Sequence, residues 1–180
     1  MIQNYFVTPV GFYDLPCPTE IVNSVIEYSR NNEFYNLWDV KEPWVGQLRS
    51  AVDVHCRDYV DGLFSNYMKD AQPVNVEGKI NIQYPNQMFP LHSHSHSHIA
   101  CVYYLNVPEN SGDLLLVDPR GDTNWTDRVD GNYSNVSYER IKPRNGLMVF
   151  FPAYLSHMVE PNSSDRIRVS LVSNYYMRRK

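Results

Sequence analysis

The chain has 180 residues, of which 43% are hydrophobic and 20% charged, and its formal net charge is -4 at pH 7. This length and composition predict one domain with a sizeable core and exclude a disordered tail protein. The acidic balance argues against a nucleic-acid partner, which requires a basic surface. No apolar run approaches the roughly 20 residues that cross a bilayer, so no membrane partner is expected.

Two further features of the composition bear on the cellular compartment. The N-terminus lacks a positive region followed by an apolar stretch, so nothing in it resembles a secretory signal. The three cysteines are odd in number and far apart, without metal-ligand spacing, and we interpret them as reduced thiols. Both observations predict a cytoplasmic protein.

The first ~70 residues are predicted to form helices with irregular joins. Residues 18–32 carry an N-cap candidate and then apolar residues at helical spacing, which predicts a first helix. Residues 34–46 are aromatic-rich but interrupted by Pro43 and Gly46, so we expect a loop. A longer helix is predicted from about Gln47 to Met68. Its apolar stripe comprises Val52, Cys56, Tyr59, Val60, Leu63 and Tyr67.

From residue 74 onward, short apolar alternations cut by Pro, Gly and Asn predict seven or eight strands. The clearest strands span residues 79–84, 99–107, 114–117, 146–152 and 167–176. Strands this short and evenly punctuated favour a double-sheet jelly roll or a barrel over a βαβ fold. Polar residues 120–140 predict either a long hairpin or a mobile loop over a site.

Four of the six histidines alternate with serine over residues 92–98. If this segment is extended, all four imidazoles share one face, and two of them at i and i+2 can bind one metal ion. A third ligand must come from elsewhere, and His157, after the strand that turns at Pro152, is the candidate. A low-complexity surface loop and a packing role for His157 are the alternatives. His55 on the long helix is interpreted as packing.

The last strand begins with an Arg-x-Arg-x-Ser pattern about ten residues after His157. A buried arginine with a hydroxyl two residues later forms a bidentate clamp for a carboxylate, because both side chains point to one face. Arg168 and Ser170 have this spacing, and Arg166 is the rival clamp.

These motifs, taken in order over roughly residues 75–176, resemble the iron(II)/2-oxoglutarate-dependent oxygenases, and in particular a small bacterial and phage group with a His-x-His-Pro segment. The residues that carry the resemblance are His92 and His94, Val102–Leu105, Asp118–Arg120, Phe151–Pro161, Arg168 with Ser170, and Asn174. Residues 6–10 also resemble the N-terminal strand of that group.

The resemblance implies a fold that is mainly β with N-terminal helices: a double-stranded β-helix, or jelly roll, of the cupin-like kind. We expect a single domain over residues 1–180, with residues 1–73 as helical support and 74–180 as the β-helix core.

The resemblance also implies an Fe(II) site held by His92, His94 and His157. Most of the superfamily has Asp or Glu at the second position, so this chain departs from the pattern at His94 and leaves the site with a charge of +2. A register shift that makes His94 and His96 the pair is the alternative.

The cosubstrate implied by the resemblance is 2-oxoglutarate. Arg168 and Ser170 would hold its distal carboxylate, and Tyr104 would donate a hydrogen bond to the same group. We prefer Arg168 over Arg166 because the register to Asn174 fits it. No catalytic residue is expected beyond the metal ligands.

The implied activity is hydroxylation of a C–H bond in a peptide side chain or a small molecule, with release of succinate and CO₂. Two alternatives remain open: a three-histidine cupin-type dioxygenase that uses no 2-oxoglutarate, and a non-catalytic jelly-roll module that binds metal. The sequence does not predict the substrate or the oligomeric state.

Overall fold

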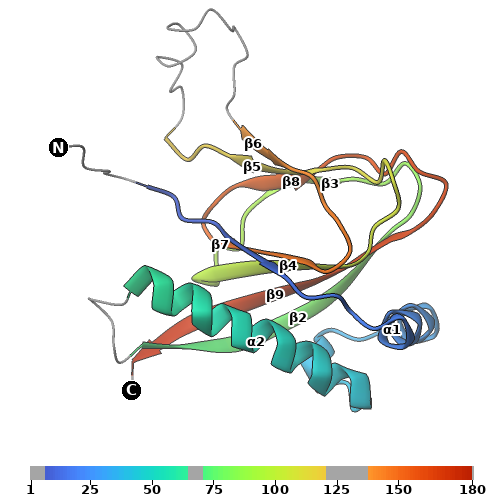
Figure 1. Cartoon of the computed structure of the whole chain (residues 1–180), viewed down its shortest axis with the longest axis horizontal. Helices are drawn as coiled ribbons and strands as arrows, with labels where there is room; N and C mark the ends of the chain where they lie inside the picture. The colour runs from blue at the N-terminus through green and yellow to red at the C-terminus, as the bar shows by residue number, and fades with distance from the viewer. Residues whose placement is uncertain (1–6, 65–70, 121–137, 180) are drawn as a thin grey trace, which may run out of the picture.

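The computed structural model describes residues 7–64, 71–120 and 138–179 (Figure 1). Along the chain these residues form β1 (Gly11–Asp14), α1 (Thr19–Asn31), the 3₁₀ helix η1 (Leu37–Asp39), α2 (Pro43–Phe64), β2 (Ala71–Gln83), β3 (Phe89–His92), β4 (Ile99–Asn106), β5 (Leu114–Val117), β6 (Tyr138–Ile141), β7 (Leu147–Pro152), β8 (His157–Val159) and β9 (Arg168–Arg179). None of the helices described is long and apolar enough to cross a membrane.

The strands form two antiparallel sheets that face each other. The five-stranded sheet has the order β1-β7-β4-β9-β2, and the four-stranded sheet has the order β3-β8-β5-β6. Figure 1 shows α1 and α2 on the side of the larger sheet that faces away from the smaller one. This is the predicted double-stranded β-helix with N-terminal helices.

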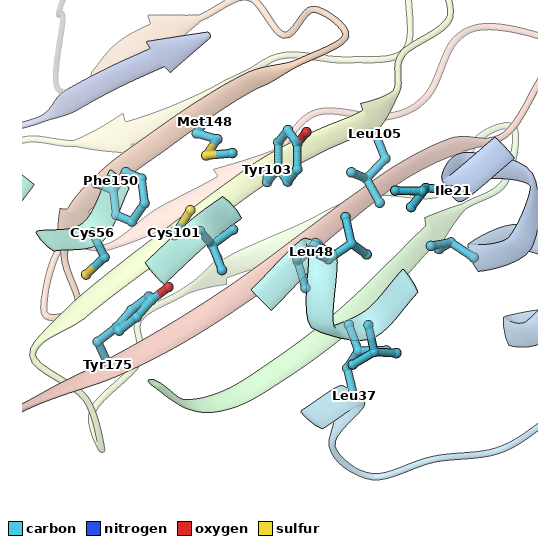
Figure 2. Packing of buried hydrophobic residues seen from close by; sticks show 14 of the residues in the cluster. Ile21, Leu37, Leu48, Cys56, Cys101, Tyr103, Leu105, Met148, Phe150 and Tyr175 are labelled. Carbon is cyan, nitrogen blue, oxygen red and sulfur yellow. The ribbon is translucent and has the colours of Figure 1, made fainter. Parts of the chain in front are cut away.

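The core has two layers because side chains alternate between the faces of each strand. Tyr103 of β4 and Phe150 of β7 point outward and pack with Leu48 and Cys56 of α2, as Figure 2 shows. The neighbouring Tyr104 points inward, between the sheets. The helices therefore cover the outer face, and the inner face of the same sheet remains available to line a cavity.

The helical region differs from the prediction in one place. The segment expected to be a loop contains η1, and α2 begins at Pro43 rather than near Gln47. A proline is tolerated in the first turn of a helix, because the N–H that it lacks has no partner there. Trp44 and Val45 are buried in the first turn of α2. The predicted end of this helix, with Tyr67 and Met68, lies outside the described residues.

The N-terminal strand also lies later than expected. Residues 7–10 are not part of a strand, Phe6 lies outside the described residues, and β1 starts at Gly11. Pro9 cannot donate to a strand ladder, which accounts for the shift. Gly11 is required where it is, because an added Cβ would lie 2.6 Å from Cδ2 of Tyr59.

The five strands that the sequence places most clearly correspond to β2, β4, β5, β7 and β9, whereas β3, β6 and β8 are not among them. β2 and β9 extend beyond the predicted segments and pair from Ala71↔Arg179 to Gln83↔Arg168. β5 and β6 pair as the two arms of a hairpin. The middle of the predicted 120–140 connection lies outside the described residues. Cys17, Cys56 and Cys101 are free thiols, as expected.

Candidate metal centre and its cavity

Three of the predicted ligands meet at the edge of the four-stranded sheet. His92 ends β3 and His157 begins β8, and the two are directly paired. His94 follows two residues after β3, and its backbone N–H donates to the carbonyl of Ala153. One ring nitrogen of each histidine lies within 4.8 Å of the other two, and Nε2 of His94 is 3.3 Å from Nε2 of His157. The strand pairing therefore brings together ligands that are far apart in the sequence.

Backbone carbonyls fix the orientation of two of these rings. Nδ1 of His157 lies 2.9 Å from the carbonyl oxygen of Leu155, and Nδ1 of His92 lies 2.7 Å from that of Pro90. A carbonyl only accepts, so each Nδ1 carries the proton and each Nε2 keeps its lone pair. This is the outer hydrogen bond that metal-binding histidines normally make.

The environment keeps two of the imidazoles neutral. Burial lowers the pKa of His157 to about 4, an effect that the hydrogen bond to Leu155 only partly opposes. Burial also lowers the pKa of His94, and the neighbouring His92 lowers it further. Neutral imidazoles are the form that binds a metal ion, and three of them suit a divalent transition metal such as Fe(II).

The other two histidines of the alternating segment lie apart from this group. The expectation of a continuous extended segment is wrong, because Ser95 and His96 form a turn after β3. His98 instead accepts a hydrogen bond from the N–H of Met177 through Nδ1. His55 packs on α2, with Nδ1 2.7 Å from the carbonyl of Ala51, as expected for a structural residue.

A cavity of about 290 Å³ runs between the two sheets from the histidines toward Arg168. Its floor consists of alternate residues on the inner faces of β2, β9 and β4. In this register Gln83 lies opposite Arg168, and Ser170 lies between Asn81 and Tyr104. The cavity therefore joins a cluster of metal-ligand nitrogens to a buried cation.

Arg168 is 2% exposed and has only neutral partners. Its Nη1 donates to the carbonyl oxygens of Ser111 at 3.1 Å and Gly112 at 2.9 Å, and its Nη2 donates to Oε1 of Gln83. Among residues 7–64, 71–120 and 138–179, no carboxylate forms an ion pair with it. Burial lowers the pKa of Arg168, but a guanidinium remains charged in proteins. A buried charge without a counter-ion is costly, which points to an anionic ligand.

Tyr104 and Ser170 complete this end of the cavity. The Tyr104 hydroxyl is fully buried and has no hydrogen-bond partner within the described part of the chain. Burial raises the pKa of Tyr104, so the hydroxyl keeps its proton as a donor. The guanidinium carbon of Arg168 lies 5.9 Å from the centre of the tyrosine ring, and Ser170 is 4% exposed. An orphaned donor beside an unpaired cation fits a carboxylate.

The rival clamp lies elsewhere. Arg166 precedes β9 rather than sharing a strand face with Arg168, because β9 starts at Arg168 itself. Its side chain is 71% exposed, and Nε is 4.0 Å from Oδ1 of Asp165. Arg166 is therefore an exposed charge that does not line the cavity.

The sequence reasoning missed the polar residues that β2 contributes to the cavity. Glu77 accepts hydrogen bonds from Nδ2 of Asn174 at 2.7 Å and from Nζ of Lys79 at 2.8 Å. Burial alone would raise the pKa of Glu77, but these two hydrogen bonds lower it below its usual value. Residues 77, 79 and 81 line the cavity from one face of β2, and this period of two is the signal that could have identified them.

Comparisons with known proteins agree with this geometry. The family model described as "Putative 2OG-Fe(II) oxygenase" matches residues 80–174, more than half of the chain. No curated protein matches the sequence.

Three similar solved structures share the fold at low sequence identity. A prolyl-4-hydroxylase from Pseudomonas putida has a TM-score of 0.60 and 17% identity, covering 94% of this chain and 88% of its own. HygX from Streptomyces hygroscopicus, solved with nickel and 2-oxoglutarate, has a TM-score of 0.60 and 13% identity. The match covers 93% of this chain and 82% of HygX. An oxidoreductase of the 2OG-Fe(II) oxygenase family from Burkholderia pseudomallei has a TM-score of 0.57 and 15% identity.

The match to the Burkholderia protein covers 76% of this chain and 60% of that chain, so this chain spans less than two thirds of its length. The family match spans the four strands of the smaller sheet, β4 and β7 of the larger sheet, and parts of β2 and β9, but not β1. It includes every residue predicted for the metal site and the clamp. The chain therefore belongs to the 2OG-Fe(II) oxygenases, the family whose metal is Fe(II) and whose cosubstrate is 2-oxoglutarate.

Proposed function

We propose that the chain is an Fe(II)- and 2-oxoglutarate-dependent hydroxylase that acts on a C–H bond of a small molecule or a peptide side chain. One observation carries this proposal. A single cavity holds three converging histidines at one end and a buried guanidinium without a carboxylate partner in the described residues at the other. A ligand that both chelates a metal and carries a distal carboxylate suits both ends.

His92 and His157 would hold the metal through Nε2, because Nδ1 of each donates to a backbone carbonyl, and His94 would supply one ring nitrogen as the third ligand. Three neutral imidazoles leave the site with a charge of +2, whereas a carboxylate in the second position would leave +1. When bound, Fe(II) supplies the activation of O₂ that couples decarboxylation of 2-oxoglutarate to substrate oxidation. The protein orients the ligands and excludes water from the space between the sheets.

Arg168, Ser170 and Tyr104 would hold the distal carboxylate of the cosubstrate. Arg168 supplies the charge, and the carbonyls of Ser111 and Gly112 fix one edge of its guanidinium. The Tyr104 hydroxyl would gain the partner that it lacks. Charge-assisted hydrogen bonds of this kind are about twice as strong as neutral ones.

The buried residues of the cavity discriminate between this proposal and the two alternative functions. A three-histidine dioxygenase without 2-oxoglutarate explains His94 better, but it leaves Arg168 and Ser170 without a task and gives the buried charge of Arg168 no counter-ion among the described residues. A non-catalytic metal-binding module leaves both Arg168 and the Tyr104 hydroxyl without a role. The similar prolyl-4-hydroxylase fold makes a peptide a reasonable substrate by analogy only. The three free thiols suit a reducing compartment, and we keep the cytoplasm as the proposed location.

Thermal unfolding under anaerobic conditions tests the proposal. Fe(II) together with 2-oxoglutarate should stabilise the fold by about 4 kcal/mol when the ligand exceeds its Kd a thousandfold. Arg168→Met should abolish the contribution of 2-oxoglutarate and retain that of the metal. Arg166→Met is the matched control, because that side chain is exposed and outside the cavity. No effect of 2-oxoglutarate on the wild type, or its loss in Arg166→Met alone, would contradict the proposal.

Turnover separates an enzyme from a binding module. The wild type should convert 2-oxoglutarate to succinate in the presence of Fe(II) and O₂, and His157→Ala should not. Metal binding without any succinate would favour the non-catalytic alternative.

A further inference from the structure

We propose that Gln83 is a positioning residue that orients Arg168 for the distal carboxylate and leaves the arginine charge for the ligand to neutralise. This inference rests on the proposed function and deepens it. Gln83 is the last residue of β2, is 1% exposed, and lies directly opposite Arg168 in the β2–β9 register. Its Oε1 accepts a hydrogen bond from Nη2 of Arg168.

The orientation of the Gln83 amide is fixed by its other end. Nε2 donates to the carbonyl oxygens of Gln87, at 2.5 Å, and Glu160, at 3.1 Å. Both partners only accept, so Nε2 must face them and Oε1 must face Arg168. A flipped amide would set its NH₂ group against the guanidinium, where two donors meet. The buried Asn162 holds the backbone here, because its Nδ2 donates to the Gln83 carbonyl at 3.0 Å.

The protein uses part of the hydrogen-bonding capacity of Arg168, and no carboxylate of the described residues forms an ion pair with its charge. Three of the five N–H donors of the guanidinium donate to Gln83, Ser111 and Gly112, and every one of these acceptors is a neutral oxygen. The nearby Asp113 carboxylate is paired with Arg140, at 3.3 Å. Two donors of Arg168 are thus left for an anion, and among the described residues no ion pair neutralises its charge.

A glutamine suits this position better than the residues closest to it in shape. A methionine of similar size would remove the acceptor on Nη2 and leave the guanidinium held only at its Nη1 edge, by the carbonyls of Ser111 and Gly112. A glutamate would supply a permanent counter-ion in direct contact with Nη2, which would compete with the carboxylate of the ligand. The amide therefore orients the cation without neutralising it.

The test compares two ligands that differ by one group. Calorimetry measures the binding of 2-oxoglutarate and of 2-oxopentanoate, which lacks the distal carboxylate, to protein loaded with Mn(II), so that no turnover interferes. Gln83→Met should weaken 2-oxoglutarate binding by about tenfold. Gln83→Glu should weaken it by about a hundredfold. Binding of 2-oxopentanoate and of Mn(II) should stay within about twofold of the wild type in both variants.

The matched controls are Gln47→Met and Gln47→Glu, the same changes at an exposed residue of α2. They should bind both ligands as the wild type does. If Gln83→Met does not fold, Gln83→Asn replaces it, because the shorter amide withdraws the acceptor and keeps the polarity.

Each outcome has one meaning. Selective loss of 2-oxoglutarate binding supports the positioning role. Equal loss of both ligands shows a merely structural role, and wild-type binding in Gln83→Glu shows that the charge balance is irrelevant; either result overturns the inference. If the wild type itself binds 2-oxoglutarate no better than 2-oxopentanoate, the proposed function fails instead.

Discussion

Acid should destabilise the metal-free protein through His157 in particular. Burial lowers the pKa of this histidine from 6.5 to about 4 in the folded chain. In the unfolded chain His157 has its ordinary pKa. Between pH 6.5 and about pH 4, His157 is therefore mostly protonated in the unfolded chain and mostly neutral in the folded chain. Since the unfolded state takes up more protons in this window, the free energy of unfolding rises with pH, and acidification lowers it.

The size of the effect follows from the shift. One pKa unit corresponds to about 1.36 kcal/mol, so His157 alone should remove about 2 kcal/mol of stability by pH 5 and about 3 kcal/mol by pH 4. His94, whose pKa is also lowered by burial, contributes in the same direction. The loss is a large fraction of the stability of a typical domain.

Urea unfolding at a series of pH values from 7.5 to about 4.5, with a chelator present, measures this dependence. His157→Gln removes the titrating group and should flatten the curve by the amount worked out above. His55→Gln, the same substitution on α2 away from the cavity, is the matched control. If the wild type and His157→Gln lose stability in parallel between pH 6.5 and 5, the argument from burial is wrong.

Three further predictions concern the site and its support. Tyr104→Phe removes a buried hydroxyl without a partner in the described residues; it should raise the free energy of unfolding of the ligand-free protein by about 1 kcal/mol and weaken 2-oxoglutarate binding about tenfold, as measured by urea unfolding and calorimetry. His92→Ala should lose Mn(II) binding and His96→Ala should retain it, since His96 lies outside the histidine group; retention in His92→Ala together with loss in His96→Ala would restore the shifted register. Gly112→Ala should destabilise the fold by about 1–3 kcal/mol, because Gly112 has φ +87° and an added Cβ would lie 2.4 Å from the Glu160 carbonyl oxygen, whereas Gly62→Ala on α2, where a Cβ meets nothing within 4 Å, should not destabilise it.

The sequence predicted the parts of this protein that depend on periodic patterns. The apolar pattern located four of the five strands of the larger sheet and β5 of the smaller one, because a half-buried strand must alternate. The spacing of Arg168 and Ser170 placed both on one face of β9 for the same reason. His157 was identifiable because a short apolar strand and a turn precede it.

Other features depend on partners that a linear pattern does not show. The turn after His92 is stabilised by the N–H of Ser97 donating to the carbonyl of His94, so the alternation of histidines does not continue as a strand. The role of Gln83 comes from contacts with Gln87, Glu160 and Arg168, three separate segments of the chain. The early start of α2 required Pro43 to be recognised as a helix-initiating residue rather than a helix breaker.

A crystal structure grown anaerobically with Fe(II) and 2-oxoglutarate, with anomalous data at the iron edge, tests the central claim most directly. We predict one iron peak bound by His92, His94 and His157, with the distal carboxylate of 2-oxoglutarate on Arg168 and the Tyr104 hydroxyl. An iron peak bound by His96 would contradict the account. So would a distal carboxylate that is held by Arg166 and makes no contact with Arg168.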